Sequence, residues 1–199
     1  MDKISKAVLI SIRPEWVEKI AEGQKTVEVR RTRPKLEPPF KCYIYCTNTR
    51  PFLVWGDVFR GDWMTEFTRL SGYSRAEADR IWDVFNGNVA GEFICDSIVT
   101  YNYDYCPHPE IGMDYDCGDS WWEISDEDLE SACLAEKEFR YYAFGREEMY
   151  GWHISNLKIY DVPLEITAFR KPELPTGLRY EEDAIKRPPQ SWCYAEELQ

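Results

Sequence analysis

The chain has 199 residues, of which 44% are apolar and 15% aromatic, and its formal net charge is −12. This composition excludes a disordered chain, and the length suits one domain of residues 1–199 with an insertion better than two complete domains. The apolar run before Arg13 is too short for a secretory signal or a membrane-spanning helix, so we expect a cytoplasmic protein without a membrane partner.

The first predicted elements are a strand, a short helix and a second strand. Residues 7–12 form a nearly continuous apolar run, which is typical of a buried strand. Pro14 suits the first position of a helix, and Gly23 suits its end. Residues 25–31 alternate two valines with polar side chains, which predicts a strand with one buried face.

The middle of the chain continues with strands and one helix. Residues 41–47 alternate cysteine and isoleucine with tyrosine, which predicts a third strand. A helix is expected over residues 74–86, because its first residues have the spacing of a capping box. Residues 89–101 predict a long strand with a turn or bulge near Asp96.

Most of the acidic charge lies in one segment. Residues 103–138 contain twelve acidic residues and one basic residue, and we expect residues 102–149 to form an acidic insertion. Within it, residues 125–138 predict a capped amphipathic helix. By contrast, residues 25–35 contain five basic residues and one acidic residue. The negative net charge, which normally argues against nucleic-acid binding, therefore does not exclude an anionic ligand at the basic stretch.

Two further strand segments are predicted near the end of the chain. Residues 150–160 predict one strand or a strand pair, and residues 188–197 contain a short final strand entered through two prolines. Strands outnumber helices, and the helices do not alternate with them. This pattern predicts an α+β or barrel fold instead of a doubly wound sheet.

The cysteines do not form a recognisable metal framework. There are seven of them, without a CxxC pair, and reduced thiols are expected because no secretory signal is present. Cys106, His108 and Cys117 come nearest to a ligand set, but their spacing matches no standard zinc site. We therefore expect neither a metal nor a cofactor.

The stretch GQKTVEVR, residues 23–30, contains the pattern Gly-x-Lys-x-x-Glu-x-Arg, formed by Gly23, Lys25, Glu28 and Arg30. With the preceding strand and helix and the strands that follow, it resembles the signature of bacterial and phage ASCH domains, within the PUA-like superfamily. The resemblance implies a small, mostly antiparallel β-barrel with flanking helices and an acidic helical insertion. It also implies a polar cleft beside the motif strand, similar to clefts that bind RNA or modified bases.

The residue types of the motif suit a polar ligand. Lys25 and Arg30 can hold a phosphate or a carbonyl group, and Glu28 can accept hydrogen bonds from an amino group or act as a general base. Because Lys25 has the opposite strand parity to Glu28 and Arg30, it joins them only if the regular strand begins after it. The further candidates for ligand contacts, including aromatic side chains that can stack a base, are Thr26, Tyr45, Trp152, His153, Ser191 and Trp192.

Each candidate also has a purely structural interpretation. Glu28 and Arg30 lie two residues apart on one strand face, which a surface ion pair of little energetic value would explain. His153 suits a proton carrier, but a histidine between apolar neighbours is more often a hydrogen-bonded structural residue. Trp192 is as well explained by a position in the apolar core as by one at the rim of the cleft.

Three functions follow from these observations. The first is binding of RNA or of a modified nucleotide. The second is hydrolysis, by a ribonuclease or an amidohydrolase of N4-acylated cytidine, with Lys25 and Glu28 as catalytic residues. Family amidohydrolases use a Lys and a Thr three residues later, and here Glu28 occupies that Thr position, so the nucleophile is not carried over. The third is capture of a basic protein partner by residues 103–138, against the simpler interpretation that these acidic residues maintain solubility.

Overall fold

The computed structural model describes residues 6–49, 52–54, 57–59, 85–104, 121–172 and 183–198. In chain order, the elements are β1 (Lys6–Ile12), α1 (Pro14–Ala21), β2 (Val27–Arg30), β3 (Phe40–Cys46), β4 (Phe52–Val54), β5 (Asp57–Phe59), β6 (Val89–Asp104), β7 (Trp121–Trp122), α4 (Asp126–Ser131), α5 (Glu136–Ala143), β8 (Glu148–Leu164), η1 (Ile166–Ala168) and β9 (Trp192–Glu196). The helix predicted over residues 74–86 and the trio Cys106, His108 and Cys117 lie outside the described residues.

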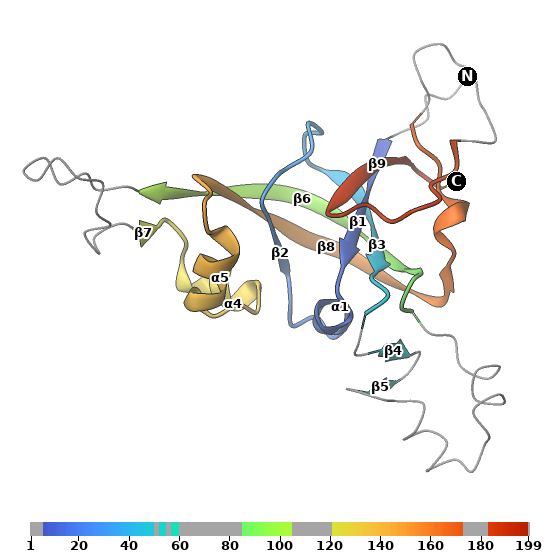
Figure 1. Ribbon diagram of the computed structural model, residues 1–199, viewed down its shortest axis with the longest axis horizontal. Helices are drawn as coiled ribbons and strands as arrows, with labels where there is room; N and C mark the ends of the chain where they lie inside the picture. The colour runs from blue at the N-terminus through green and yellow to red at the C-terminus, as the bar shows by residue number, and fades with distance from the viewer. Residues whose placement is uncertain are drawn as a thin grey trace, which may run out of the picture.

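One sheet of seven strands organises the fold (Figure 1). Its order is β2-β8-β6-β3-β1-β9, with β7 paired to β6. All of these pairings are antiparallel except that of β1 with β3, which is parallel and is connected through α1 and β2. The predicted α+β class and the mostly antiparallel pairing are confirmed. No backbone ladder joins β2 to β9 in the described part of the chain, so the sheet is open and not a closed barrel.

Alternation along the strands divides the core into two faces. On one face, the even-numbered residues of β1 and β3 pack with α1 and with Trp152 of β8. On the other face, the odd-numbered residues Leu9, Tyr43 and Tyr45 pack under Phe169 from the segment after β8. The sheet is therefore covered on both sides, which agrees with the apolar run predicted for the first strand.

A third apolar cluster joins the acidic insertion to the sheet. Figure 1 shows β6 and β8 as two long strands that reach the end of the molecule where β7, α4 and α5 lie. Val27 and Val29 of β2 pack there with Leu129 of α4 and Phe139 of α5. The insertion thus covers the valine face of the motif strand, and the opposite face, with Glu28 and Arg30, is buried as well.

The single helix predicted over residues 125–138 is wrong, because two helices, α4 and α5, occupy this region. The Ser125 hydroxyl caps α4 by accepting a hydrogen bond from the Asp128 amide at 3.0 Å, as predicted. Cys133 then has φ = 53°, a left-handed conformation that ends the helix. A second start follows, where the Ala135 amide donates to the Glu138 carboxylate at 2.9 Å.

The long strand predicted at residues 89–101 is confirmed as part of β6, with a register shift between Cys95 and Ile98 where a bulge was expected near Asp96. The region predicted as a strand or strand pair at residues 150–160 is one longer strand, β8. In the described part of the chain, none of the helices is long and apolar enough to cross a membrane. Nor does that part contain a group of three or more His, Cys, Asp or Glu side chains placed to hold a metal ion.

Gly91 lies where β6 passes close to the backbone of β8. A Cβ atom at this position would lie 2.4 Å from the backbone carbonyl oxygen of Lys158, in a strand that cannot move aside. We expect Gly91→Ala to lower the free energy of unfolding by about 2 kcal/mol, measured by urea denaturation. Thr100→Ala, at an exposed position of the same strand, should change it by less than about 1 kcal/mol. Equal effects of the two substitutions would contradict this explanation.

Candidate functional site

The three charged side chains of the motif meet inside the fold. Lys25 Nζ lies 3.4 Å from Glu28 Oε2, and Arg30 NH2 lies 3.0 Å from Glu28 Oε1. Only 3% of Lys25, 7% of Glu28 and 8% of Arg30 is exposed to solvent. The ion pair anticipated between Glu28 and Arg30 is therefore present, but it is buried and includes a second cation. We call these three residues the charged cluster.

The turn after α1 brings Lys25 into the charged cluster. Gly23 has φ = 72°, and the amides of Gln24 and Lys25 both donate to the Lys19 carbonyl, at 2.9 and 3.0 Å. Because β2 begins only at Val27, strand parity does not apply to Lys25. Its ammonium group also donates to the Ala132 carbonyl at 2.7 Å.

Arg30 connects β2 with the opposite end of the sheet. Its NH2 group donates to the Ser11 carbonyl of β1 at 2.6 Å, and NH1 donates to Ser191 Oγ, just before β9, at 3.5 Å. Its positive charge also acts on the thiol of Cys42 in the core. Burial raises the pKa of Cys42 well above its ordinary value, and Arg30 opposes part of this shift. Arg30 therefore lies at the edge of the apolar core and links the two ends of the open sheet.

Tryptophans surround the charged cluster. Lys25 Nζ lies 5.2 Å from the ring centroid of Trp16 in α1, a cation–π contact. Trp152, the cross-strand partner of Glu28, is fully buried, and its ring centroid lies 6.1 Å from that of Trp192. Trp192 donates from Nε1 to Thr32 Oγ1 at 3.0 Å and is only half-buried. Aromatic surfaces thus lie on two sides of the charges.

Two buried N–H donors of the site have no hydrogen-bond partner among the described residues: Arg30 Nε and Trp152 Nε1. In addition, the ion pairs of the charged cluster set two cations against one carboxylate. An unpaired buried donor costs about 1–3 kcal/mol, and an uncompensated buried charge costs more. The site therefore has an excess of positive charge and of donors, which suits a ligand that supplies acceptor oxygens.

The structure brings together six of the nine residues proposed from the sequence: Lys25, Glu28, Arg30, Trp152, Ser191 and Trp192. Thr26 contributes through its backbone, since its amide donates to Ser131 and its carbonyl accepts from Ile154. Tyr45 lies on the other face of the sheet, in the cluster under Phe169.

His153 points away from the charged cluster, because it follows Trp152 in β8. Its Nδ1 lies 2.7 Å from Asp96 Oδ1, and both side chains are exposed. Partial burial alone would raise the pKa of Asp96, but hydrogen bonds from His153 and Ser155 and the charge of His153 lower it below its ordinary value. His153 thus makes the structural hydrogen bond that the sequence allowed, and it does not reach the site.

The sequence did not indicate three groups that complete the site: the Ser11 carbonyl, the Ala132 carbonyl and the ring of Trp16. Every residue has a backbone carbonyl, so the sequence cannot indicate which carbonyls contact the site. The Ser11 and Ala132 carbonyls become evident only from the order of the strands and from the packing of the insertion. Trp16 was predicted from the sequence as an apolar residue of the helix, about two helical turns before the motif, and this position was the only sign of its role.

Comparison with known proteins gives a family match and a set of structural neighbours. The ASCH domain family model matches residues 10–53. A crystal structure of the ASCH protein from Zymomonas mobilis is 20% identical, covers 94% of this chain and 86% of that chain, and has a TM-score of 0.47. A mutant of that protein is 20% identical over 96% and 90% of the two chains, with a TM-score of 0.46. A search of curated proteins gives no match. The region matched by the family model contains the whole charged cluster.

We expect Glu28→Gln to destabilise the fold strongly, because it leaves Lys25 and Arg30 buried without a countercharge. The free energy of unfolding should fall by about 3 kcal/mol or more in urea denaturation. Glu136→Gln is the matched control, since Glu136 pairs with Arg140 at 2.8 Å while 61% of its side chain is exposed. That change should cost less than about 1 kcal/mol. If the free energy of unfolding falls by the same small amount in both variants, the cluster does not contribute to stability as described.

Proposed function

We propose, since the chain contains an ASCH domain matched over residues 10–53, that it binds RNA or a modified nucleotide at the charged cluster. The observation that supports this most directly is the buried excess of positive charge, in which two cations share one carboxylate and two N–H donors remain unpaired. A phosphate or a base carbonyl supplies the missing acceptors. Trp192, which is half-buried, offers a surface on which a base can stack.

The geometry of the cluster suits binding of a ligand better than hydrolysis of one. Both oxygens of Glu28 contact cations, at 3.4 and 3.0 Å, so the carboxylate is engaged in holding the cluster together. Thr26 is engaged through its backbone, and the position three residues after Lys25 is Glu28. A threonine nucleophile of the family type is therefore not available at this position, and hydrolysis is the weaker alternative.

The acidic insertion has a structural explanation within its described residues. Ser131 and Ala132 accept hydrogen bonds from the Thr26 amide and from Lys25, and Leu129 packs on the valines of β2. These contacts support the motif strand. Capture of a basic protein partner by residues 103–138 is the second alternative, and nothing in these contacts requires it.

Binding can be tested by substituting, one at a time, two lysines that both contact the ring of Trp16. Lys25 Nζ and Lys19 Nζ lie 5.2 and 5.0 Å from the ring centroid of Trp16, but only Lys25 belongs to the charged cluster. We expect Lys25→Met to weaken binding of nucleoside monophosphates and short single-stranded RNA by about tenfold or more, because it removes a charged donor. Lys19→Met should leave the affinity within about twofold. Quenching of tryptophan fluorescence on titration measures both.

The outcome that contradicts the proposal is equal affinity of the Lys25→Met and Lys19→Met variants for every nucleotide tried. Loss of the fold must be separated from loss of binding, so the far-ultraviolet circular dichroism of each variant is compared with that of the parent. The same preparations test hydrolysis: turnover of N4-acetylcytidine or RNA by the parent protein, above a blank without protein, would favour the enzymatic alternative.

A further inference from the structure

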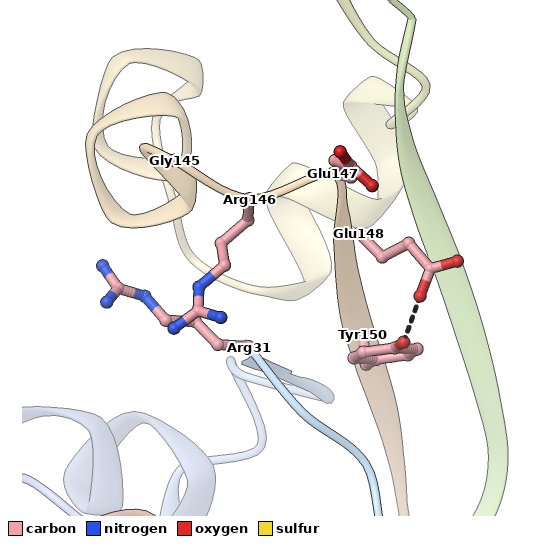
Figure 2. Close-up of a pocket in the computed structure, with 6 residues that line it drawn as sticks. All are labelled: Arg31, Gly145, Arg146, Glu147, Glu148 and Tyr150. Carbon is pink, nitrogen blue, oxygen red and sulfur yellow. Dashed lines mark hydrogen bonds between the residues drawn. The ribbon is translucent and has the colours of Figure 1, made fainter.

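A second polar site lies beside the charged cluster. It is a pocket of about 340 Å³ lined by Arg31, Gly145, Arg146, Glu147, Glu148 and Tyr150 (Figure 2). This volume is within the range of pockets that hold small ligands. Arg31 follows Arg30 directly, and Tyr150 is the cross-strand partner of Arg30 in the ladder between β2 and β8. The two sites are thus neighbours in the chain, with Arg31 directed at Tyr142 of the insertion and Arg30 at Ser11 of β1.

Two arginines provide the positive charge of the pocket. Arg31 donates from Nε and NH2 to the Tyr142 carbonyl, at 2.9 and 2.6 Å, and its guanidinium lies 4.8 Å from the Tyr142 ring centroid. These contacts fix the orientation of Arg31. Figure 2 shows the guanidinium groups of Arg31 and Arg146 on the same side of the pocket, opposite Tyr150 and Glu148. A planar guanidinium is well suited to phosphate oxygens.

Among the described residues, the two carboxylates that line the pocket, Glu147 and Glu148, form no ion pair with these arginines. Glu148 accepts a hydrogen bond from the Tyr150 hydroxyl, and the ion pairs among the described residues include neither Arg31 nor Arg146. The hydrogen bond to Glu148 raises the pKa of Tyr150, and the nearby charge of Arg33 opposes this shift. Three arginines therefore lie near one edge of β2 without a paired carboxylate.

Two exposed aromatic residues lie just before the pocket residue Gly145 in the chain. Phe144, directly before Gly145, is 85% exposed, and Tyr141 at the end of α5 is 86% exposed. Side chains this apolar are normally buried, unless they serve a contact with another molecule. Arginines next to exposed aromatic rings are the combination that binds single-stranded nucleic acid, by contacting phosphates and stacking bases.

We propose that this pocket is a phosphate subsite for single-stranded RNA, so that the ligand of the domain is an oligonucleotide and not a free nucleoside. The proposal rests on the nucleotide site proposed for the charged cluster. One nucleotide occupies the cluster, and a backbone phosphate of the adjoining strand lies between Arg31 and Arg146. Phe144 provides the stacking surface where the strand leaves the pocket. An acidic peptide would satisfy the arginines but would make no use of the aromatic surfaces.

The test compares Arg146→Gln with Arg140→Gln. Arg146 lines the pocket, whereas Arg140 is an exposed arginine of α5 that pairs with Glu136. Binding of a labelled single-stranded RNA of about eight nucleotides is followed by fluorescence anisotropy at several salt concentrations. We expect Arg146→Gln to weaken the affinity for this RNA about tenfold. The slope of log affinity against log salt concentration should fall by about 0.7, the contribution of one phosphate contact.

Arg140→Gln should leave both quantities unchanged, and neither variant should alter binding of a nucleoside monophosphate. The subsite is wrong if the two arginine variants behave alike, if the parent does not bind RNA, or if polyglutamate binds as tightly with the same dependence on Arg146. If Lys25→Met weakens binding of mononucleotides but Arg146→Gln does not weaken binding of RNA, the subsite is wrong and the proposed function stands. If Arg146→Gln weakens binding of RNA but Lys25→Met does not weaken binding of mononucleotides, the subsite stands and the cluster is not the nucleotide site.

Discussion

One buried carboxylate, that of Glu28, holds together the part of the molecule on which the site depends. Its two oxygens contact Lys25 from the turn after α1 and Arg30 from β2. Arg30 in turn reaches the Ser11 carbonyl and Ser191, at the opposite end of the open sheet. Burying three charges costs several kcal/mol per ion, and an apolar core of the same volume is often as stable or more stable. Because the ion pairs of the cluster leave one positive charge in excess, we propose that a ligand supplies the missing negative charge.

The acidity of the chain and its basic motif are structurally coupled. The insertion that carries most of the negative charge supplies the Ala132 carbonyl to Lys25 and the Ser131 carbonyl to the Thr26 amide, and it covers the valines of β2. Neutral carbonyl groups thus support the cation from the insertion side, while the described acidic side chains of α4 and α5 are mostly exposed. Solvent screens exposed charges much more strongly than buried ones. The exposed carboxylates that dominate the net charge of −12 therefore have little electrostatic effect on the buried cations of the site.

The sequence predicted the long strands of the sheet and the alternation along the motif strand, because these depend on local periodicity. Alternation placed Val27 and Val29 on one face of β2 and Glu28 and Arg30 on the other, and Gly23 marked the turn that frees Lys25 from strand parity. Properties that depend on the order of strands were not available from periodicity. Tyr45 alternates correctly with Cys46, but only the sheet topology shows that the tyrosine face is the one packed under Phe169. The break between α4 and α5 was missed because Cys133 is not a residue type that signals a left-handed turn.

We propose that a ligand supplies acceptors to the two unpaired donors of the site, Arg30 Nε and Trp152 Nε1. The most direct measurement is a titration of ¹⁵N-labelled protein with single-stranded RNA, in which the N–H resonances of Arg30 Nε and Trp152 Nε1 are followed. Trp121, which is 47% exposed on β7, provides an indole resonance away from the cluster. We expect the Arg30 and Trp152 protons to shift downfield as they gain hydrogen-bond partners, while the Trp121 proton stays in place. Saturated binding that leaves the Arg30 and Trp152 resonances unmoved would contradict it.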